Sequence, residues 1–338
     1  MKIIVDAYGG DNAPLEVLRG CAAAVEAYGY EIILCGLEKS LRKLALEYDI
    51  PLKNFTFVEA PDVISMEDDP GSILKKKKNC SMAVGLRLLG EGGGDAFVSG
   101  GSTGALVVGG TFYVKRIKGI KRCALATLMP STKDYFMLLD VGANVDCRPE
   151  MLRQFGIMGS VYMESVMGRA EPKVGLVNIG TETTKGGELQ LNSFELLQQA
   201  PVNFIGNVEA REIPYGDCDV LVCDGFTGNI ILKLTEGLAS SLLGQIKDIF
   251  KSNMRGKLAA AMVMPGMKEL KKRMSTEEVG GAPLLGTLRP VFKAHGNSNA
   301  KAFQNAIRVA ADFASKGVID RITESLAERS KEEKEIEE

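Results

Sequence analysis

The sequence predicts an α/β protein of three layers, with a mainly parallel sheet between two layers of helices. Strand-like and helical segments alternate along the chain, which is typical of parallel sheets covered on both faces. A strand, a glycine-rich turn and a helix also follow one another twice with the same spacing. The 338 residues are enough for one large domain with a sizeable core. We therefore expect a single domain over residues 1–338, with an active-site cleft between two lobes.

Apolar runs and turn residues mark the elements in order. Lys2–Asp6 reads as the first strand, and Pro14 stands near the first helical position of Leu15–Tyr28. The other expected strands are Glu31–Cys35, Phe55–Glu59, Tyr135–Asp140, Lys173–Ile179 and Asn203–Gly206. The other expected helices are Leu37–Tyr48, Pro149–Met167, Leu189–Gln199, Ile230–Ser252 and Asn299–Lys316. Gly280–Gly286 reads as a glycine-rich loop, and the charged tail 328–338 is expected to fray.

The stretch Gly94–Leu106 carries the first strand–turn–helix unit. Its apolar residues Ala96–Val98 suit a buried strand, and the turn that follows is made of small residues: Gly100, Gly101, Ser102, Thr103 and Gly104. Glycine lets the backbone turn sharply and approach a ligand. The hydroxyl residues stand where a helix would begin, which favours binding of an anion.

The same unit returns at Asp219–Asn229. The two copies align without gaps at Asp95 and Asp219, Val98 and Val222, Gly101 and Gly225, Thr103 and Thr227, and Gly104 and Gly228. Strand–turn–helix units occur in any α/β protein, but two turns that share Gly-x-Thr-Gly are a stronger signal. We interpret the two bends as two walls of one site.

Composition excludes several classes of function. The net charge of −2 gives no indication of nucleic-acid binding. Seven scattered cysteines without C-x-x-C suggest buried thiols in a reducing cytosol, and a single histidine argues against a zinc site. Since the chain opens directly on a strand and has no apolar run of roughly 20 residues, we predict neither a signal peptide nor a membrane span. The sequence predicts no cofactor and no metal.

The segment Arg255–Met274 combines apolar residues with a lysine-rich rim, and Pro265-Gly266 interrupts it. We interpret it as a protruding amphipathic helical hairpin suited to an anionic membrane surface or an oligomer contact. An ordinary hairpin packed on the core is the alternative. The residues expected to contact the membrane are Leu258, Met262, Val263, Met264, Met267 and Leu270.

The segment Met66–Lys78 is polar, with acidic residues at 67–69 and four lysines at 75–78. A solvated helix with complementary charges at its ends is one interpretation, and a docking patch for an acidic partner is the other.

The first glycine bend matches one familiar catalytic motif. The sequence has neither a dinucleotide-binding G-x-G-x-x-G after a strand nor a P-loop. Gly100–Gly104 does match the G-x-S-x-G of serine hydrolases, with His295 downstream in the required order. The second copy carries Phe226 at the position of Ser102, which argues against a nucleophile. The loops that follow the expected strands instead offer neutral donors, glycine and one lysine, Lys185, and this mixture suits a phosphate-like oxyanion.

Seven motifs in order resemble the PlsX family of acyl-[acyl-carrier-protein]–phosphate acyltransferases. They are Asp6-x-x-Gly9-Gly10-Asp11-x-x-Pro14, Ser99–Ala105, Asp140–Asn144, Asn178–Gly186, Phe204-x-Gly-Asn-x-Glu-x-Arg211, Asp224–Asn229 and His295-Gly-x-Ser298. The first bend departs from the family pattern at Gly100 and Ser102, where the family usually has Ala and Asn.

The resemblance implies a fold similar to isopropylmalate and isocitrate dehydrogenases and to phosphotransacetylases. It implies transfer of a long-chain acyl group from acyl carrier protein to inorganic phosphate, giving acyl phosphate for phospholipid synthesis. It also implies a cytoplasmic homodimer attached peripherally to the membrane, with a downstream membrane acyltransferase as a further partner. A phosphotransacetylase acting on acyl-CoA, a serine hydrolase using Ser102 and a non-enzymatic membrane adaptor remain alternatives.

We assign hypothetical roles to the polar residues of these motifs. Lys185 would neutralise phosphate and the developing charge, Asn229 would donate to the oxyanion, and His295 would bind substrate or protonate the leaving thiolate. The residues expected to cradle phosphate are Ser102, Thr103, Gly104, Thr227 and Gly228. The residues expected to support neighbouring loops are Asp6, Asp11, Asn144, Asn178 and Thr181.

Overall fold

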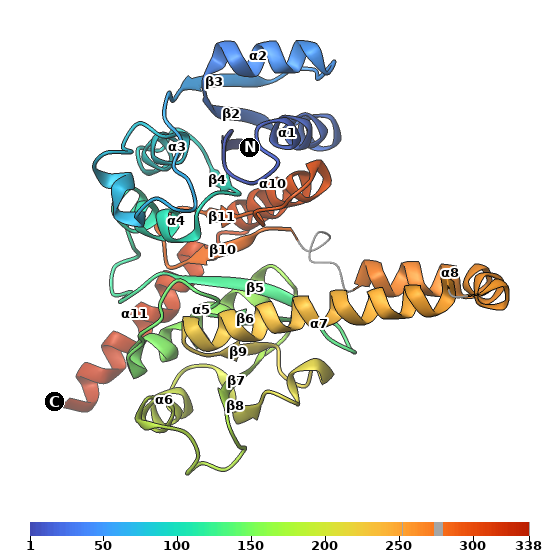
Figure 1. Ribbon diagram of the computed structural model, residues 1–338. Coiled ribbons are helices and arrows are strands. Elements are labelled where there is room, and N and C mark those ends of the chain that lie inside the picture. The colour runs from blue at the N-terminus through green and yellow to red at the C-terminus, as the bar shows by residue number, and fades with distance from the viewer. Residues whose placement is uncertain (252, 274–279, 338) are drawn as a thin grey trace.

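The computed structural model describes residues 1–251, 253–273 and 280–337. Eleven strands form one sheet in the order β3-β2-β1-β4-β11-β10-β5-β6-β9-β7-β8, and helices lie on both of its faces (Figure 1). The predicted α/β architecture is therefore confirmed. The strands are β1 (Lys2–Asp6), β2 (Glu31–Gly36), β3 (Phe55–Glu59), β4 (Ala96–Ser99), β5 (Ala124–Pro130), β6 (Tyr135–Leu139), β7 (Lys173–Asn178), β8 (Asn203–Glu209), β9 (Val220–Val222), β10 (Ala282–Leu285) and β11 (Val291–Lys293).

The helices follow the expected alternation. The α-helices are α1 (Leu15–Tyr28), α2 (Glu38–Glu47), α3 (Ser81–Gly90), α4 (Thr103–Gly109), α5 (Pro149–Ser165), α6 (Glu188–Gln198), α7 (Gly225–Lys251), α8 (Met254–Arg273), α10 (Ala300–Ser315) and α11 (Val318–Glu337). Three short helical turns complete them: η1 (Pro70–Leu74), η2 (Gly110–Val114) and η3 (Ile213–Tyr215).

Apolar side chains on both faces hold the sheet between its helices. On one face α1, α5 and α10 bury residues such as Val17, Phe155 and Phe303 against the strands. Each such buried side chain contributes roughly 1.5–3 kcal/mol to folding. A Cβ at Gly20 of α1 would lie 2.5 Å from Phe303 Cβ, so only glycine lets α1 and α10 pack this closely. The other face is covered by α3 and α4 in the first half of the sheet and by the start of α7 in the second.

Strand direction divides the sheet into two lobes. β3, β2, β1, β4 and β11 are parallel to one another, and β6, β9, β7 and β8 form a second parallel set. The three antiparallel pairings β11–β10, β10–β5 and β5–β6 join the sets. Because the number of reversals is odd, the two parallel sets run in opposite senses, and β4 and β9 end at opposite edges of the sheet.

Several local expectations were wrong. The glycine-rich loop predicted at Gly280–Gly286 contains strand β10, because its apolar residues pair with β5 and β11. The segment 66–78 is not a solvated helix: only η1 is helical there, and Pro70 begins it. Residues 255–273 form one helix with Pro265 inside it, not a hairpin, so proline removes one hydrogen bond without ending the helix. Met274 lies outside the described residues. The tail 328–337 is helical in α11, and its fraying stays a prediction.

Candidate functional site

The first glycine bend lies where three neighbouring parallel strands end. Ser99, the last residue of β4, pairs with Lys293, the last residue of β11. Asp6 at the end of β1 is buried and accepts hydrogen bonds from the hydroxyls of Ser81 (2.5 Å) and Ser99 (2.6 Å). Burial raises the pKa of Asp6, although these bonds act in the opposite direction. Asp6 therefore ties β1, β4 and α3 together beneath the bend. Its supporting role in the site stays a prediction.

Two further loops close on this bend. The backbone N–H of Asp11 donates to the carbonyl of Gly296 at 2.7 Å, and Asn12 Nδ2 donates to the carbonyl of Asn297 at 3.1 Å. Gly10 has a φ of 119°, and a Cβ there would lie 3.0 Å from the Gly296 carbonyl oxygen, so this position requires glycine. The structure thus brings the loops 7–14, 100–102 and 295–298 together, as expected for a ligand crevice at the carboxyl ends of strands.

Ser102, Thr103 and Gly104 begin α4. The buried Ser102 is its N-cap, and Ser102 Oγ accepts a hydrogen bond from the backbone N–H of Ala105 at 3.5 Å. No hydrogen bond between Ser102 and His295 is found in the described part of the chain. The serine-hydrolase alternative therefore lacks the contact between nucleophile and base that it needs.

Lys293 is a residue of this site that sequence reasoning missed. Lys293 Nζ donates to the carbonyls of Gly100 (3.0 Å) and Ala294 (2.7 Å), so the ammonium group holds the first bend directly. Burial of the ammonium group lowers the pKa of Lys293 to about 8. The signal in the sequence was a lone charged residue between Phe292 and Ala294, two positions before His295, and it was overlooked because 291–293 was not recognised as a strand.

The second glycine bend begins α7 in the other lobe. Asp224 accepts hydrogen bonds from both the backbone N–H (2.9 Å) and the hydroxyl (2.7 Å) of Thr227, so it caps the helix. The N–H of Gly225 donates to the carbonyl of Asn144 at 2.7 Å. Asn144 Nδ2 in turn donates to the buried Asp140 carboxylate at 2.8 Å. Thr227 thus uses its donors within the bend, and Asn144 contacts both the bend and Asp140. The supporting role of Asn144 stays a prediction.

Lys185 lies with this second group of residues. It belongs to the loop after β7, where Asn178 Nδ2 donates to the Lys185 carbonyl at 3.1 Å. The side chains of Lys185 and Thr181 are exposed, and so is that of Asn229 on α7. Since β6, β9 and β7 are parallel neighbours, the residues that follow them share one edge of the sheet. The roles of Lys185, Asn229 and Thr181 stay predictions.

Helix α7 links the two groups. Although the two bends leave opposite edges of the sheet, α7 starts at the second bend, crosses the sheet at β5 and β6 and then projects from the body (Figure 1). Glu236 Oε1 on α7 lies 3.8 Å from His295 Nε2, and Glu236 Oε2 lies 3.4 Å from Lys233 Nζ. The face of α7 that carries Asn229, Lys233 and Glu236 therefore approaches the loop 295–298. The second bend begins α7, and α7 approaches the loop that closes on the first bend. That the two bends form two walls of one site stays a prediction.

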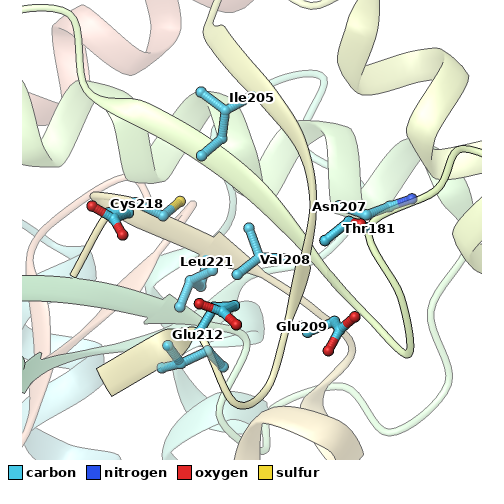
Figure 2. Close-up of a pocket in the computed structure, with 10 residues that line it drawn as sticks. Thr181, Ile205, Asn207, Val208, Glu209, Glu212, Cys218 and Leu221 are labelled. Atoms are coloured by element: carbon cyan, nitrogen blue, oxygen red, sulfur yellow. The ribbon is translucent and has the colours of Figure 1, made fainter. Parts of the chain in front are cut away.

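A separate groove opens beside β8 and β9. It has a volume of about 170 Å³, with Val208 and Leu221 in its apolar floor and Glu209 and Glu212 among its lining residues (Figure 2). Thr181 is the one predicted site residue that lines it. Carboxylates repel a phosphate dianion, so this groove is not a suitable anion site.

Helices α7 and α8 form an arm that projects from the body of the protein (Figure 1). Of the six residues predicted to contact a membrane, Leu258, Met262, Val263, Met264 and Leu270 are exposed, and Met267 is partly buried. Helix α7 adds its own exposed apolar row at every fourth position: Phe226, Ile230, Leu234, Leu238 and Leu242. No helix among the described residues is both long enough and apolar enough to cross a bilayer. Over the same residues, no cluster of side chains suited to a metal ion is found.

The fold is shared with phosphotransacetylases of known structure. The chain superimposes on a phosphotransacetylase from Streptococcus pyogenes with a TM-score of 0.65 at 17% identity, over 94% of each chain. It also superimposes on the EutD phosphotransacetylase from Staphylococcus aureus with a TM-score of 0.62 at 16% identity, over 93% of this chain and 94% of the other. At these identities the likeness establishes a shared fold.

Sequence comparison shows which family the chain belongs to. Residues 1–321 match the family described as "Fatty acid synthesis protein". The chain is 46% identical over 327 residues to a phosphate acyltransferase of Alkaliphilus oremlandii, covering 97% of this chain and 98% of the relative. It is 44% identical over 329 residues to a phosphate acyltransferase of Clostridium acetobutylicum, covering 97% and 99%. The chain belongs to this phosphate acyltransferase family, as the seven motifs predicted, and its chemistry is acyl transfer to phosphate.

Proposed function

We propose that the protein transfers a long-chain fatty acyl group from the thioester of acyl carrier protein to inorganic phosphate. The products are acyl phosphate, which serves phospholipid synthesis, and the free thiol of the carrier. The observation that carries the proposal is the convergence of two strand-end loops on the first glycine bend, with the polar face of α7 approaching one of them, in a chain of the phosphate acyltransferase family.

The chemistry requires positioning more than covalent catalysis. Phosphate attacks the thioester carbonyl, a tetrahedral oxyanion forms, and the thiolate leaves. Bringing two reactants together and stabilising the oxyanion with fixed donors supply most of the rate enhancement in such reactions. In this proposal Lys185 and Asn229 contribute donors from the second lobe, and His295 protonates the thiolate. His295 is half-exposed and approaches the Glu236 carboxylate, which would orient its ring.

The projecting arm supports two further proposals. Its apolar rows are too extensive to be left in water, so we propose that the row on α7 packs against a second copy of the chain in a homodimer. We propose that the apolar residues of α8, such as Leu258 and Met262, contact an anionic membrane beside the lysines of the same helix. A cytoplasmic protein attached peripherally in this way could pass acyl phosphate to a membrane acyltransferase.

The experiment is an assay of acyl phosphate formed from palmitoyl carrier protein as a function of phosphate concentration. We expect acyl phosphate that increases with phosphate and saturates, and little free palmitate. Lys185→Ala should abolish turnover with the thermal midpoint unchanged. Activity with palmitoyl-CoA but none with palmitoyl carrier protein would show that the acyl donor is coenzyme A thioester and not carrier protein. Release of free fatty acid without phosphate dependence would refute it.

A further inference from the structure

Lys293 is a cation without an anionic partner at the centre of the candidate site. The acceptors of its ammonium group are two neutral backbone carbonyls, those of Gly100 and Ala294. An ammonium group has three protons, so these bonds leave one donor. No carboxylate lies within ion-pair distance of Lys293 in residues 1–251, 253–273 and 280–337. A half-buried charge that is not neutralised by the protein is costly unless something else pairs with it.

The carboxylates nearest to Lys293 are occupied or lie too far away to pair with it. Asp6 and Asp11 both attract Lys293 electrostatically, but neither contacts it. Asp6 already accepts hydrogen bonds from the hydroxyls of Ser81 and Ser99 and from the backbone N–H of Tyr8 (3.1 Å). Neither carboxylate therefore supplies the missing partner of Lys293.

A second lysine on a separate element lies close enough to Lys293 to influence it electrostatically. Lys233 projects from α7, and its charge acts against that of Lys293. Lys233 shares the Glu236 carboxylate, at 3.4 Å, with His295. Two cations that approach one another from separate elements repel, and an anion between them removes the repulsion.

We propose that Lys293 is the principal cation of the phosphate-binding site and that Lys233 assists it from α7. This inference rests on the proposed function and names the residues that bind its phosphate substrate. Inorganic phosphate accepts a hydrogen bond from the remaining N–H of Lys293 and lies between β11 and α7, next to His295. Lys293 also fixes the Gly100 carbonyl, so the same residue holds the first bend and meets the anion. Lys185 in the other lobe is then free to act on the thioester side.

Direct binding of inorganic phosphate to the full-length protein, measured by isothermal titration calorimetry at pH 7.5, tests the proposal. Because a hydrogen bond from a charged donor is among the stronger ones, we expect Lys293→Met to weaken binding by about ten- to a hundredfold. We expect Lys233→Met to weaken it several-fold. Lys301→Met is the matched control, since Lys301 is an exposed lysine in the first turn of α10, and its affinity should equal that of the wild type. Phosphate affinity of Lys293→Met within twofold of the wild type would overturn the proposal.

Two further measurements separate binding from a purely structural role. Lys293→Arg keeps the charge and should retain phosphate binding better than Lys293→Met at equal thermal stability; equal losses in both would count against the proposal. In turnover, Lys293→Met should raise the KM for phosphate and leave the KM for the acyl donor unchanged. Lys293-dependent phosphate binding without acyl transfer would refute the proposed function but not this inference. Phosphate-dependent turnover with an unchanged KM for phosphate in Lys293→Met would refute this inference but not the proposed function.

Discussion

Gly228 in the second bend is held against the backbone of the neighbouring loop, and replacing it by alanine tests how tightly the two elements pack. A Cβ there would overlap the carbonyl oxygen of Asp140 and would lie 2.9 Å from Cys223 Sγ. Asp140 is fully buried and its carboxylate is hydrogen-bonded, so the loop has little freedom to move. Overpacking of this kind costs roughly 1–3 kcal/mol, and we expect a loss of about 2 kcal/mol.

The same helix provides matched controls. Gly237 and Gly244 of α7 have no atom within 4 Å of a built Cβ. Alanine there should stabilise the protein by about 0.8–1 kcal/mol, because glycine is the weaker helix former. Unfolding entropy of about 2.1 cal/mol/K per residue gives roughly 0.7 kcal/mol/K for this chain, so a loss of about 2 kcal/mol lowers the Tm by roughly 3 °C.

Thermal melts of the three single variants under identical conditions provide the measurement. We expect Gly228→Ala to lower the Tm by roughly 3 °C and each control to raise it by roughly 1 °C. Opposite signs for one substitution within one helix can come only from the surroundings of each glycine. A Tm for Gly228→Ala at or above that of the wild type would show that the bend and the Asp140 loop are not packed as described.

Three further outcomes are expected. Phosphate binding should weaken as pH rises through about 8, where Lys293 loses its proton, and Lys293→Arg should not show this loss in titration calorimetry up to pH 9.5. Burial raises the pKa of the Cys80 thiol to about 11, so the folded state favours the protonated thiol; the resulting stabilisation is complete below pH 9 and is lost between pH 9 and 11. Urea midpoints at these pH values, compared with those of Cys80→Ser, measure this loss of stability. Asp6→Asn should lower the urea midpoint by the equivalent of about 1–3 kcal/mol, because the hydroxyls of Ser81 and Ser99 lose a carboxylate acceptor; an unchanged midpoint would contradict the role given to Asp6.

Local sequence patterns determined most of the secondary structure and the family. Alternating apolar runs predicted the bounds of β1, α1 and β3 as the structure has them, since strand and helix periods are properties of neighbouring residues. The seven ordered motifs predicted the phosphate acyltransferase family, which the comparisons confirm. The sequence also marked the two glycine bends, because turns that need small residues show in composition.

Only the tertiary structure decided how these parts face one another. Three antiparallel pairings reverse the direction of the sheet between the two bends, and no local pattern specifies which strands pair or in which sense. The same pairing places Lys293 at the end of β11 beside Ser99, almost 200 positions earlier in the chain. The residues that flank a lysine in an apolar run do not indicate which groups it contacts, because these groups approach it from distant segments of the chain.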